Sequence, residues 1–107
     1  MRPEIKTICD TWVRAVQLQK IILFGSHARG AAGSESDLDF LVVWHNPSMQ
    51  TNREKAIYLR RLLPREVHVP MDLIVLTPEH YQDAISDPRT FTSLISREGK
   101  VIYESLA

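Results

Sequence analysis

The amino-acid sequence predicts a small α/β domain, of the α+β kind, in which helices pack against a mixed sheet. Apolar runs rich in Ile, Val and Leu recur at 20–24, 37–44 and 69–76, and each is short enough to be a strand. Stretches with apolar residues at helical spacing precede and separate these runs. A chain that alternates strand and helix patterns in this way is expected to form one sheet covered by helices.

The N-terminal part of the chain predicts a helix followed by two buried strands. One apolar stripe at helical spacing is formed by Ile5, Ile8, Cys9, Trp12, Val13 and Val16. The apolar run 20–24 ends at Gly25 and is expected to be a buried strand. The run 37–44 is apolar on both of its faces, which is typical of a central strand covered from both sides. Trp12 and Trp44 are therefore expected in the core.

The rest of the chain predicts five further elements. They are a helix at 52–63, a strand at 69–76, a helix from 78 to about 87, a short helix at 90–97 and a strand at 100–103. Pro64 is expected to stop the first of these helices. Thr77 is expected to cap the second, with Pro78 at its first helical position.

The length and charge of the chain restrict its function. With 107 residues it is expected to form a single domain, 1–107, large enough for one core but too small to add a substrate domain. A second half of the active site is then expected from a homo- or hetero-oligomeric partner. The thirteen basic and thirteen acidic residues cancel, which argues against strong nucleic-acid binding by this chain alone. The basic stretch 53–65 is expected to be the solvated face of a helix, and a role in binding stays open as the alternative.

Sequence features also predict where the protein resides. No apolar run approaches the roughly 20 residues of a membrane span, and no apolar segment resembles a signal peptide. We therefore expect a soluble, cytoplasmic protein that does not bind membranes. Cys9 is the single cysteine, so no internal disulfide forms, and its apolar neighbours predict a buried structural thiol.

The pattern that carries chemistry lies between Gly25 and Asp39. Gly25 and Ser26 follow the first strand, ten residues intervene, and Asp37-Leu38-Asp39 opens the next strand. Small residues let backbone N–H groups approach phosphate oxygens, and Ser26 is expected to cap a short helix. Carboxylates two residues apart on a strand leave the same face, where they repel each other unless a cation lies between them. The pattern predicts a phosphate site beside a metal site.

Asp72 is the candidate for a third acid. It is the one charged residue in 69–76, and a charge inside an apolar strand is rarely tolerated without a partner or a metal. If that strand pairs with 37–44, Asp72 joins Asp37 and Asp39 as a metal ligand and as a candidate general base. The donors are all oxygens, and no Cys or His pair has zinc-ligand spacing, so Mg²⁺ is favoured over Zn²⁺.

Taken together, these motifs resemble the nucleotidyltransferase superfamily that includes DNA polymerase beta and kanamycin nucleotidyltransferase. The resemblance rests on Gly25-Ser26, the ten-residue gap, Asp37-Leu38-Asp39 and the later Asp72. The fuller strings Gly-Ser-His-Ala-Arg-Gly and Ser-Asp-Leu-Asp-Phe-Leu-Val are similar to those of its minimal members, the MNT antitoxins that pair with HEPN toxins. The similarity covers about 20–76.

The resemblance implies a nucleotidyltransferase fold and a role for each motif residue. Gly25 and Ser26 would bind the β and γ phosphates of ATP. Asp37 and Asp39 would bind two Mg²⁺ ions, and Asp72 would bind the ion nearer the nucleophile. The reaction would transfer AMP from ATP to a tyrosine hydroxyl of a HEPN ribonuclease toxin, release pyrophosphate and silence the toxin. ATP as the donor follows from the resemblance alone.

Several alternatives stay open at this point. Arg29 either contacts the triphosphate or pairs with Glu35 or Asp37, and Ser36 either hydrogen-bonds a phosphate or fixes the loop. A binding module that keeps the fold could neutralise a toxin without catalysis, by covering its active site. Transfer to a small molecule such as an aminoglycoside would need an acceptor pocket completed by another domain or a second copy.

Overall fold

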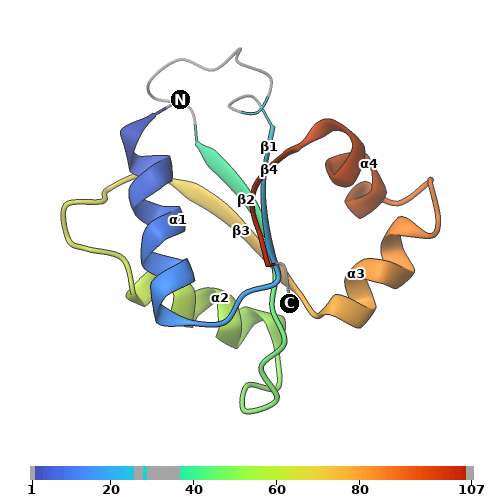
Figure 1. Cartoon of the computed structure of the whole chain (residues 1–107), viewed down its shortest axis with the longest axis horizontal. Coiled ribbons are helices and arrows are strands. Elements are labelled where there is room, and N and C mark those ends of the chain that lie inside the picture. The colour runs from blue at the N-terminus through green and yellow to red at the C-terminus, as the bar shows by residue number, and fades with distance from the viewer. Residues whose placement is uncertain (1, 26–27, 29–36, 106–107) are drawn as a thin grey trace.

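The computed structural model describes residues 2–25, 28 and 37–105. Within them the elements are α1 (Pro3–Ala15), β1 (Lys20–Phe24), β2 (Leu38–Val43), α2 (Asn52–Arg61), β3 (Met71–Leu76), α3 (Pro78–Ile85), α4 (Phe91–Glu98) and β4 (Lys100–Glu104). Figure 1 shows the sheet nearly on edge, with helices on both sides. The predicted fold class is confirmed.

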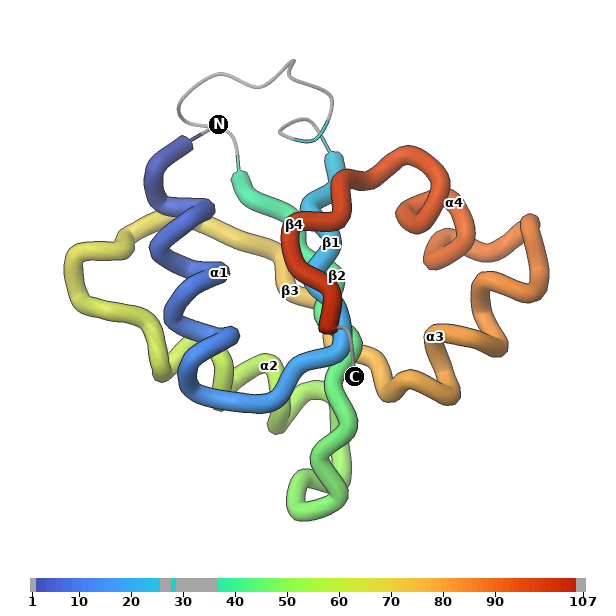
Figure 2. Tube along the Cα trace, in the orientation of Figure 1, coloured from blue at the N-terminus to red at the C-terminus, as the bar shows by residue number. Residues whose placement is uncertain are grey.

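The sheet is mixed, with the strand order β3-β2-β1-β4. β1 pairs antiparallel with both β2 and β4, whereas β2 pairs parallel with β3. Figure 2 shows the last strand of the chain, β4, lying beside β1. β2 is an interior strand, as its apolar faces predicted, and β3 is an edge strand.

The two faces of the sheet carry separate hydrophobic clusters. Phe40 and Val42 of β2 pack with residues of α1 and α2, whereas Leu41 and Val43 pack with Tyr81 of α3 and Ile95 of α4. Figure 1 shows the same division, with α1 and α2 on one side of the sheet and α3 and α4 on the other. Because strand side chains alternate between faces, the even-numbered residues of β2 face α1 and α2, and its odd-numbered residues face α3 and α4.

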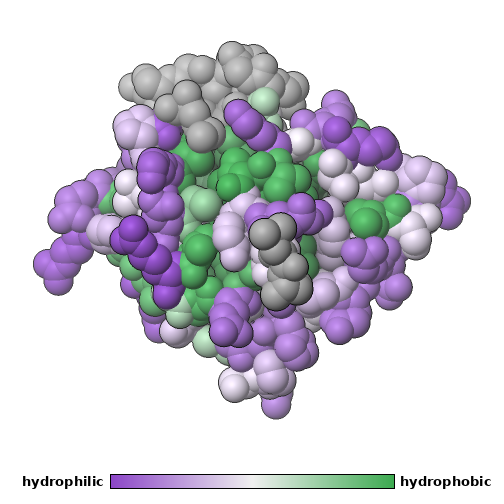
Figure 3. All heavy atoms as spheres, in the orientation of Figure 1, coloured by the Kyte–Doolittle hydropathy of each residue, from purple (hydrophilic) through white to green (hydrophobic). Residues whose placement is uncertain are grey.

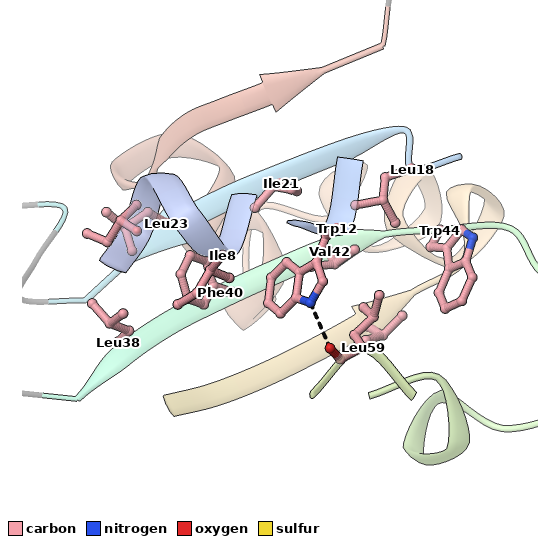
Figure 4. Packing of buried hydrophobic residues seen from close by; sticks show 12 residues of the cluster. Ile8, Trp12, Leu18, Ile21, Leu23, Leu38, Phe40, Val42, Trp44 and Leu59 are labelled. Atoms are coloured by element: carbon pink, nitrogen blue, oxygen red, sulfur yellow. Dashed lines mark hydrogen bonds between the residues drawn. The ribbon is translucent and has the colours of Figure 1, made fainter. Parts of the chain in front are cut away.

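The larger cluster is centred on Trp12, which is completely buried. Its indole Nε1–H donates a hydrogen bond of 2.8 Å to the Leu59 carbonyl oxygen, and its ring meets Phe40 edge-to-face at 5.4 Å between centroids. Figure 4 shows this bond crossing from α1 to α2 inside the apolar packing. Trp44 is also buried, so both tryptophans lie in the core as predicted.

Several element boundaries differ from those predicted. β1 spans Lys20–Phe24 as expected, but β2 begins at Leu38 and β3 at Met71. Pro70, just before β3, has no N–H to give to a ladder, which explains the later start of this strand. α2 ends at Arg61, before Pro64. The start of α3 is as predicted, since Thr77 caps it and Pro78 is its first residue.

The outer surface of the domain is largely hydrophilic on its helices. Figure 3 shows hydrophobic surface between α1 and β4, framed by hydrophilic helix surface. Among the described helices, none combines the length and apolar character that crossing a bilayer requires. Gly99 joins α4 to β4 where the chain lies tightly on β1, because a Cβ there would be 2.6 Å from Ile22 Cγ2.

Candidate active site

Asp39 and Asp72 are direct neighbours on adjacent strands. Parallel pairing of β2 with β3 makes their Cα atoms register partners. Adjacent strands lie about 4.8 Å apart, so the two carboxylates leave the sheet side by side. The alternation that sends Leu41 and Ile74 toward α3 and α4 places both acids on that same face. The predicted meeting of Asp72 with Asp39 is therefore present in the fold.

Gly25 ends β1 directly against the carboxylate of Asp39. Phe24 is the register partner of Asp39, and Gly25 follows with a φ of 74°, a conformation that favours glycine. A Cβ at residue 25 would collide with Asp39 Oδ2. Two independent constraints, backbone conformation and space, thus explain why a glycine stands at the first position of the motif.

These three residues line one cavity of about 540 Å³ between the sheet and α4, hereafter the central cavity. Its polar lining residues are Gly25, Asp39, Arg60, Asp72 and Glu98. Its apolar lining, hereafter the apolar wall, includes Phe24, Ile74, Phe91, Leu94 and Ile95, with Gly99 beside them, whereas Leu73 borders the cavity but packs with the cluster on the other sheet face. A cavity that combines charged groups with apolar side chains is typical of a small-molecule site.

Arg60 crosses the open edge of the sheet beside the acids. Its Nη2 donates a hydrogen bond of 3.2 Å to the carbonyl oxygen of Met71, the residue before Asp72. Arg60 is the one cationic side chain among the described residues that line the central cavity, and it also lines a neighbouring cavity that contains Asp37. Its charge therefore lies near the carboxylates, and its hydrogen bond ties α2 to the edge strand that carries Asp72.

The sequence of the chain was compared with those of known protein families. Residues 4–98 match the sequence model described as the nucleotidyltransferase domain. The chain belongs to this family. A comparison with curated protein sequences found no match.

Two solved structures share the fold of this nucleotidyltransferase domain. One is a candidate nucleotidyltransferase from Sulfolobus solfataricus, with 19% identity and a TM-score of 0.55 over 94% of this chain and 73% of that chain. The other is a chain from the crystal structure of a toxin–antitoxin with AMP-PNP, with 21% identity and a TM-score of 0.54 over 96% of this chain and 72% of that one. At these identities the likeness concerns the fold.

Asp37 lines a different cavity from the one that Asp39 and Asp72 line. We expected it on the same strand face as Asp39, but β2 begins after it, and strand alternation does not govern its direction. It is exposed and lines the cavity of about 470 Å³ beside Pro70 and Met71. Within the described part of the chain, no three His, Cys, Asp or Glu side chains are grouped closely enough to hold a metal ion.

The donor chemistry nevertheless fits a hard divalent cation. Asp39 and Asp72 offer carboxylate oxygens from neighbouring strands, and no His or Cys lies among the described residues of the central cavity. Carboxylate oxygens are the ligands that Mg²⁺ prefers. The predicted nucleotide contacts Ser26, Arg29 and Ser36 lie outside the residues that the structure describes.

The sequence argument for Asp72 was right about its neighbour on β2. Asp72 is exposed, because β3 is the edge strand and the residue stands at its beginning. For the basic stretch 53–65 we favoured a solvated helix face over a role in binding, and the structure shows that not all of its side chains are solvated. Lys55 is only 4% exposed, and Arg60 reaches the site. The sequence pattern of 53–65 did not show which face of α2 meets the edge strand β3.

Proposed function

We propose that this domain is a magnesium-dependent nucleotidyltransferase that transfers AMP from ATP to a tyrosine hydroxyl of a HEPN-type ribonuclease toxin. The observation that carries the proposal is the register pairing of Asp39 with Asp72 beside Gly25, in a chain of the nucleotidyltransferase domain family. The shared fold with a chain from a toxin–antitoxin crystallised with AMP-PNP supports this kind of partner and nucleotide. We propose further that the single domain, residues 1–107, acts as the antitoxin.

Different residues of the chain are proposed to bind the triphosphate and the acceptor. The backbone at Gly25 is proposed to bring N–H groups to the phosphate oxygens, at a place where a Cβ would collide with Asp39. Ser26, Arg29 and Ser36 are proposed to add contacts to the phosphates. The acceptor hydroxyl is proposed to approach over Asp72, on the exposed edge strand, which a partner protein can reach from solvent.

The proposed reaction is an in-line displacement at the α phosphorus. The acceptor oxygen forms a bond to the α phosphorus while the bond from that phosphorus to the bridging oxygen of pyrophosphate breaks. The carboxylate of Asp72 takes the proton of the attacking hydroxyl, and pyrophosphate carries away the bonding electron pair. Asp37, Asp39 and Asp72 are proposed to hold two Mg²⁺ ions, which when bound neutralise charge on the entering and leaving oxygens.

A transfer experiment with two labels tests this proposal. The domain is incubated with its purified toxin, Mg²⁺ and ATP labelled at either the α or the γ phosphorus. We expect the α label to appear on the toxin and the γ label to leave as pyrophosphate. A toxin with phenylalanine in place of the modified tyrosine should stay unlabelled, and its ribonuclease activity should persist.

Matched variants show whether the paired acids carry the reaction. Asp39→Asn and Asp72→Asn remove one charge each and should reduce labelling at least a hundredfold, because each removes a charged oxygen from the site. Asp83→Asn is the control, since Asp83 is an exposed acid of α3 that does not line the central cavity. Full toxin inhibition without nucleotide and without label would replace the proposal with occlusion. Labelling of an aminoglycoside but not of the toxin would replace it with small-molecule transfer.

A further inference from the structure

The apolar wall of the central cavity contains two side chains that the proposed phosphate and metal chemistry does not use. Phe91 is 60% exposed and Leu94 is 39% exposed, although both belong to α4, whose Ile95 is buried against the sheet. Both line the same cavity as Asp39 and Asp72. Large apolar groups exposed inside a cavity favour occupation by an apolar ligand group.

Phe91 is held in place and still has an open ring face. It meets Phe24 edge-to-face, with centroids 6.0 Å apart and an interplanar angle of 86°. In such a pair one ring uses its edge and the other uses one face. Whichever part Phe91 plays, at least one of its faces is not used by Phe24. Phe24 is also the residue before Gly25, so the platform adjoins the proposed phosphate turn.

We propose that Phe91, supported by Phe24 and Leu94, is the platform on which the base of the nucleotide lies. The inference rests on the proposed function. Across the sheet, Asp72 on β3, Asp39 on β2 and Gly25 after β1 follow one another in the strand order. In-line displacement puts the acceptor oxygen and the leaving pyrophosphate on opposite sides of the α phosphorus.

This geometry is compatible with a nucleoside that extends toward α4. If the acceptor enters over Asp72 and pyrophosphate leaves toward Gly25, the line of reaction runs across the strands. The 5′ oxygen is then an equatorial substituent, so the nucleoside departs to the side of that line. On the face that carries the acids, α4 lies to this side, and Phe91 and Leu94 are its exposed apolar residues in the cavity.

An aromatic side chain of the acceptor could also stack on Phe91 in place of a base. The position of the platform favours the base, because Phe91 contacts Phe24 on β1, at the Gly25 end of the cavity, whereas Asp72 lies on the edge strand β3. Stacking on an aromatic ring does not need hydrogen bonds to a particular base edge. A platform of this kind therefore does not by itself select one base over another.

Equilibrium binding of two probes tests the proposal. One probe is α,β-methylene-ATP, which keeps the base but cannot release pyrophosphate, and the other is tripolyphosphate, which has no base. In the presence of Mg²⁺, Phe91→Ala should weaken binding of the first about five- to a hundredfold. It should leave binding of the second unchanged, and Phe91→Trp should bind the first as the unmodified chain does.

Val101→Ala is the matched control, because Val101 is 46% exposed on β4 and does not line the central cavity. It should bind both probes normally. The platform is overturned if Phe91→Ala keeps full affinity for α,β-methylene-ATP, if it weakens both probes equally, or if it raises only the KM for the toxin. An unmodified chain that binds neither probe contradicts the proposed function itself, so the two failures are distinguishable.

Discussion

The backbone of Gly25 lies against the carboxylate of Asp39 with no room between them for a side chain. Gly25→Ala is therefore expected to impair both the fold and the site. A left-handed conformation costs a non-glycine residue roughly 1–2 kcal/mol, and the new methyl group must displace Asp39. Thermal unfolding should show a melting temperature lower by several degrees, and α-labelled AMP transfer should fall at least tenfold.

Gly99→Ala separates the steric effect from the effect on Asp39. A Cβ at residue 99 would lie 2.6 Å from both Ile22 Cγ2 and the Ile95 carbonyl oxygen. Gly99 has a φ of −77°, which any residue can adopt, so the effect of the substitution is steric only. We expect a loss of about 1–3 kcal/mol in the free energy of unfolding, as for other overpacked sites. If Gly25→Ala loses no more transfer activity than a variant of equal stability, the close contact with Asp39 has no catalytic importance.

Asp37→Ala tests whether the acid that precedes β2 takes part in the site. It lies in the neighbouring cavity, but only two residues before Asp39. We expect AMP transfer to be abolished in Asp37→Ala as in Asp39→Ala, with little change in the unfolding free energy of Asp37→Ala, because Asp37 is exposed and precedes the strand. Retained transfer by Asp37→Ala at ordinary Mg²⁺ would limit the ligands to Asp39 and Asp72.

Trp12→Phe tests the hydrogen bond between α1 and α2. The substitution removes the indole N–H that donates to the Leu59 carbonyl oxygen, which keeps a second hydrogen bond, of 3.2 Å, from the Leu62 N–H. Loss of one such hydrogen bond typically costs about 0.5–1.5 kcal/mol. Trp44→Phe is the comparison, since Trp44 is also buried but its ring packs against the exposed Tyr58. Urea unfolding should show the larger loss for Trp12→Phe. Equal losses would mean that ring volume, and not the hydrogen bond, dominates.

Cys9 should react slowly in the folded protein. Burial raises the pKa of its thiol above the ordinary value, and the negative charge of Asp10 adds to this, with Lys6 opposing it. A raised pKa leaves less thiolate near pH 8, and the thiolate is the reactive form. Iodoacetamide should therefore label the native chain more slowly than the urea-unfolded chain. The same raised pKa predicts that stability declines as the pH rises past the ordinary thiol range, because the unfolded chain ionises first.

The strands and helices were predictable because their signals are local. The apolar run 20–24 predicts β1, and the pair Thr77-Pro78 predicts the start of α3, because both signals come from residues adjacent in the sequence. Asp72 could be linked to Asp39 because a charge in an apolar run is rare, even though the edge position of β3 makes that charge exposed. The inference gave the correct partner for a reason that the structure does not support.

Other parts of the site depend on contacts between distant segments, which a single sequence does not encode locally. Arg60 resembles its basic neighbours in the sequence, and only the packing of α2 against β3 brings its guanidinium to the Met71 carbonyl. Phe91 likewise reads as one apolar residue of a short helix. Its exposure in the central cavity follows from how α4 lies over the sheet.

The parallel pairing of β2 with β3 has a thermodynamic consequence. A whole helix, α2, separates the two paired carboxylates along the chain, so they become neighbours only when the β2–α2–β3 unit has closed. A cation shared by Asp39 and Asp72 would bind the closed unit and not the open chain, and would therefore pull the unfolding equilibrium toward the native state. Cellular cation supply and the lifetime of the folded protein would then be coupled, and depletion would expose the chain to proteolysis.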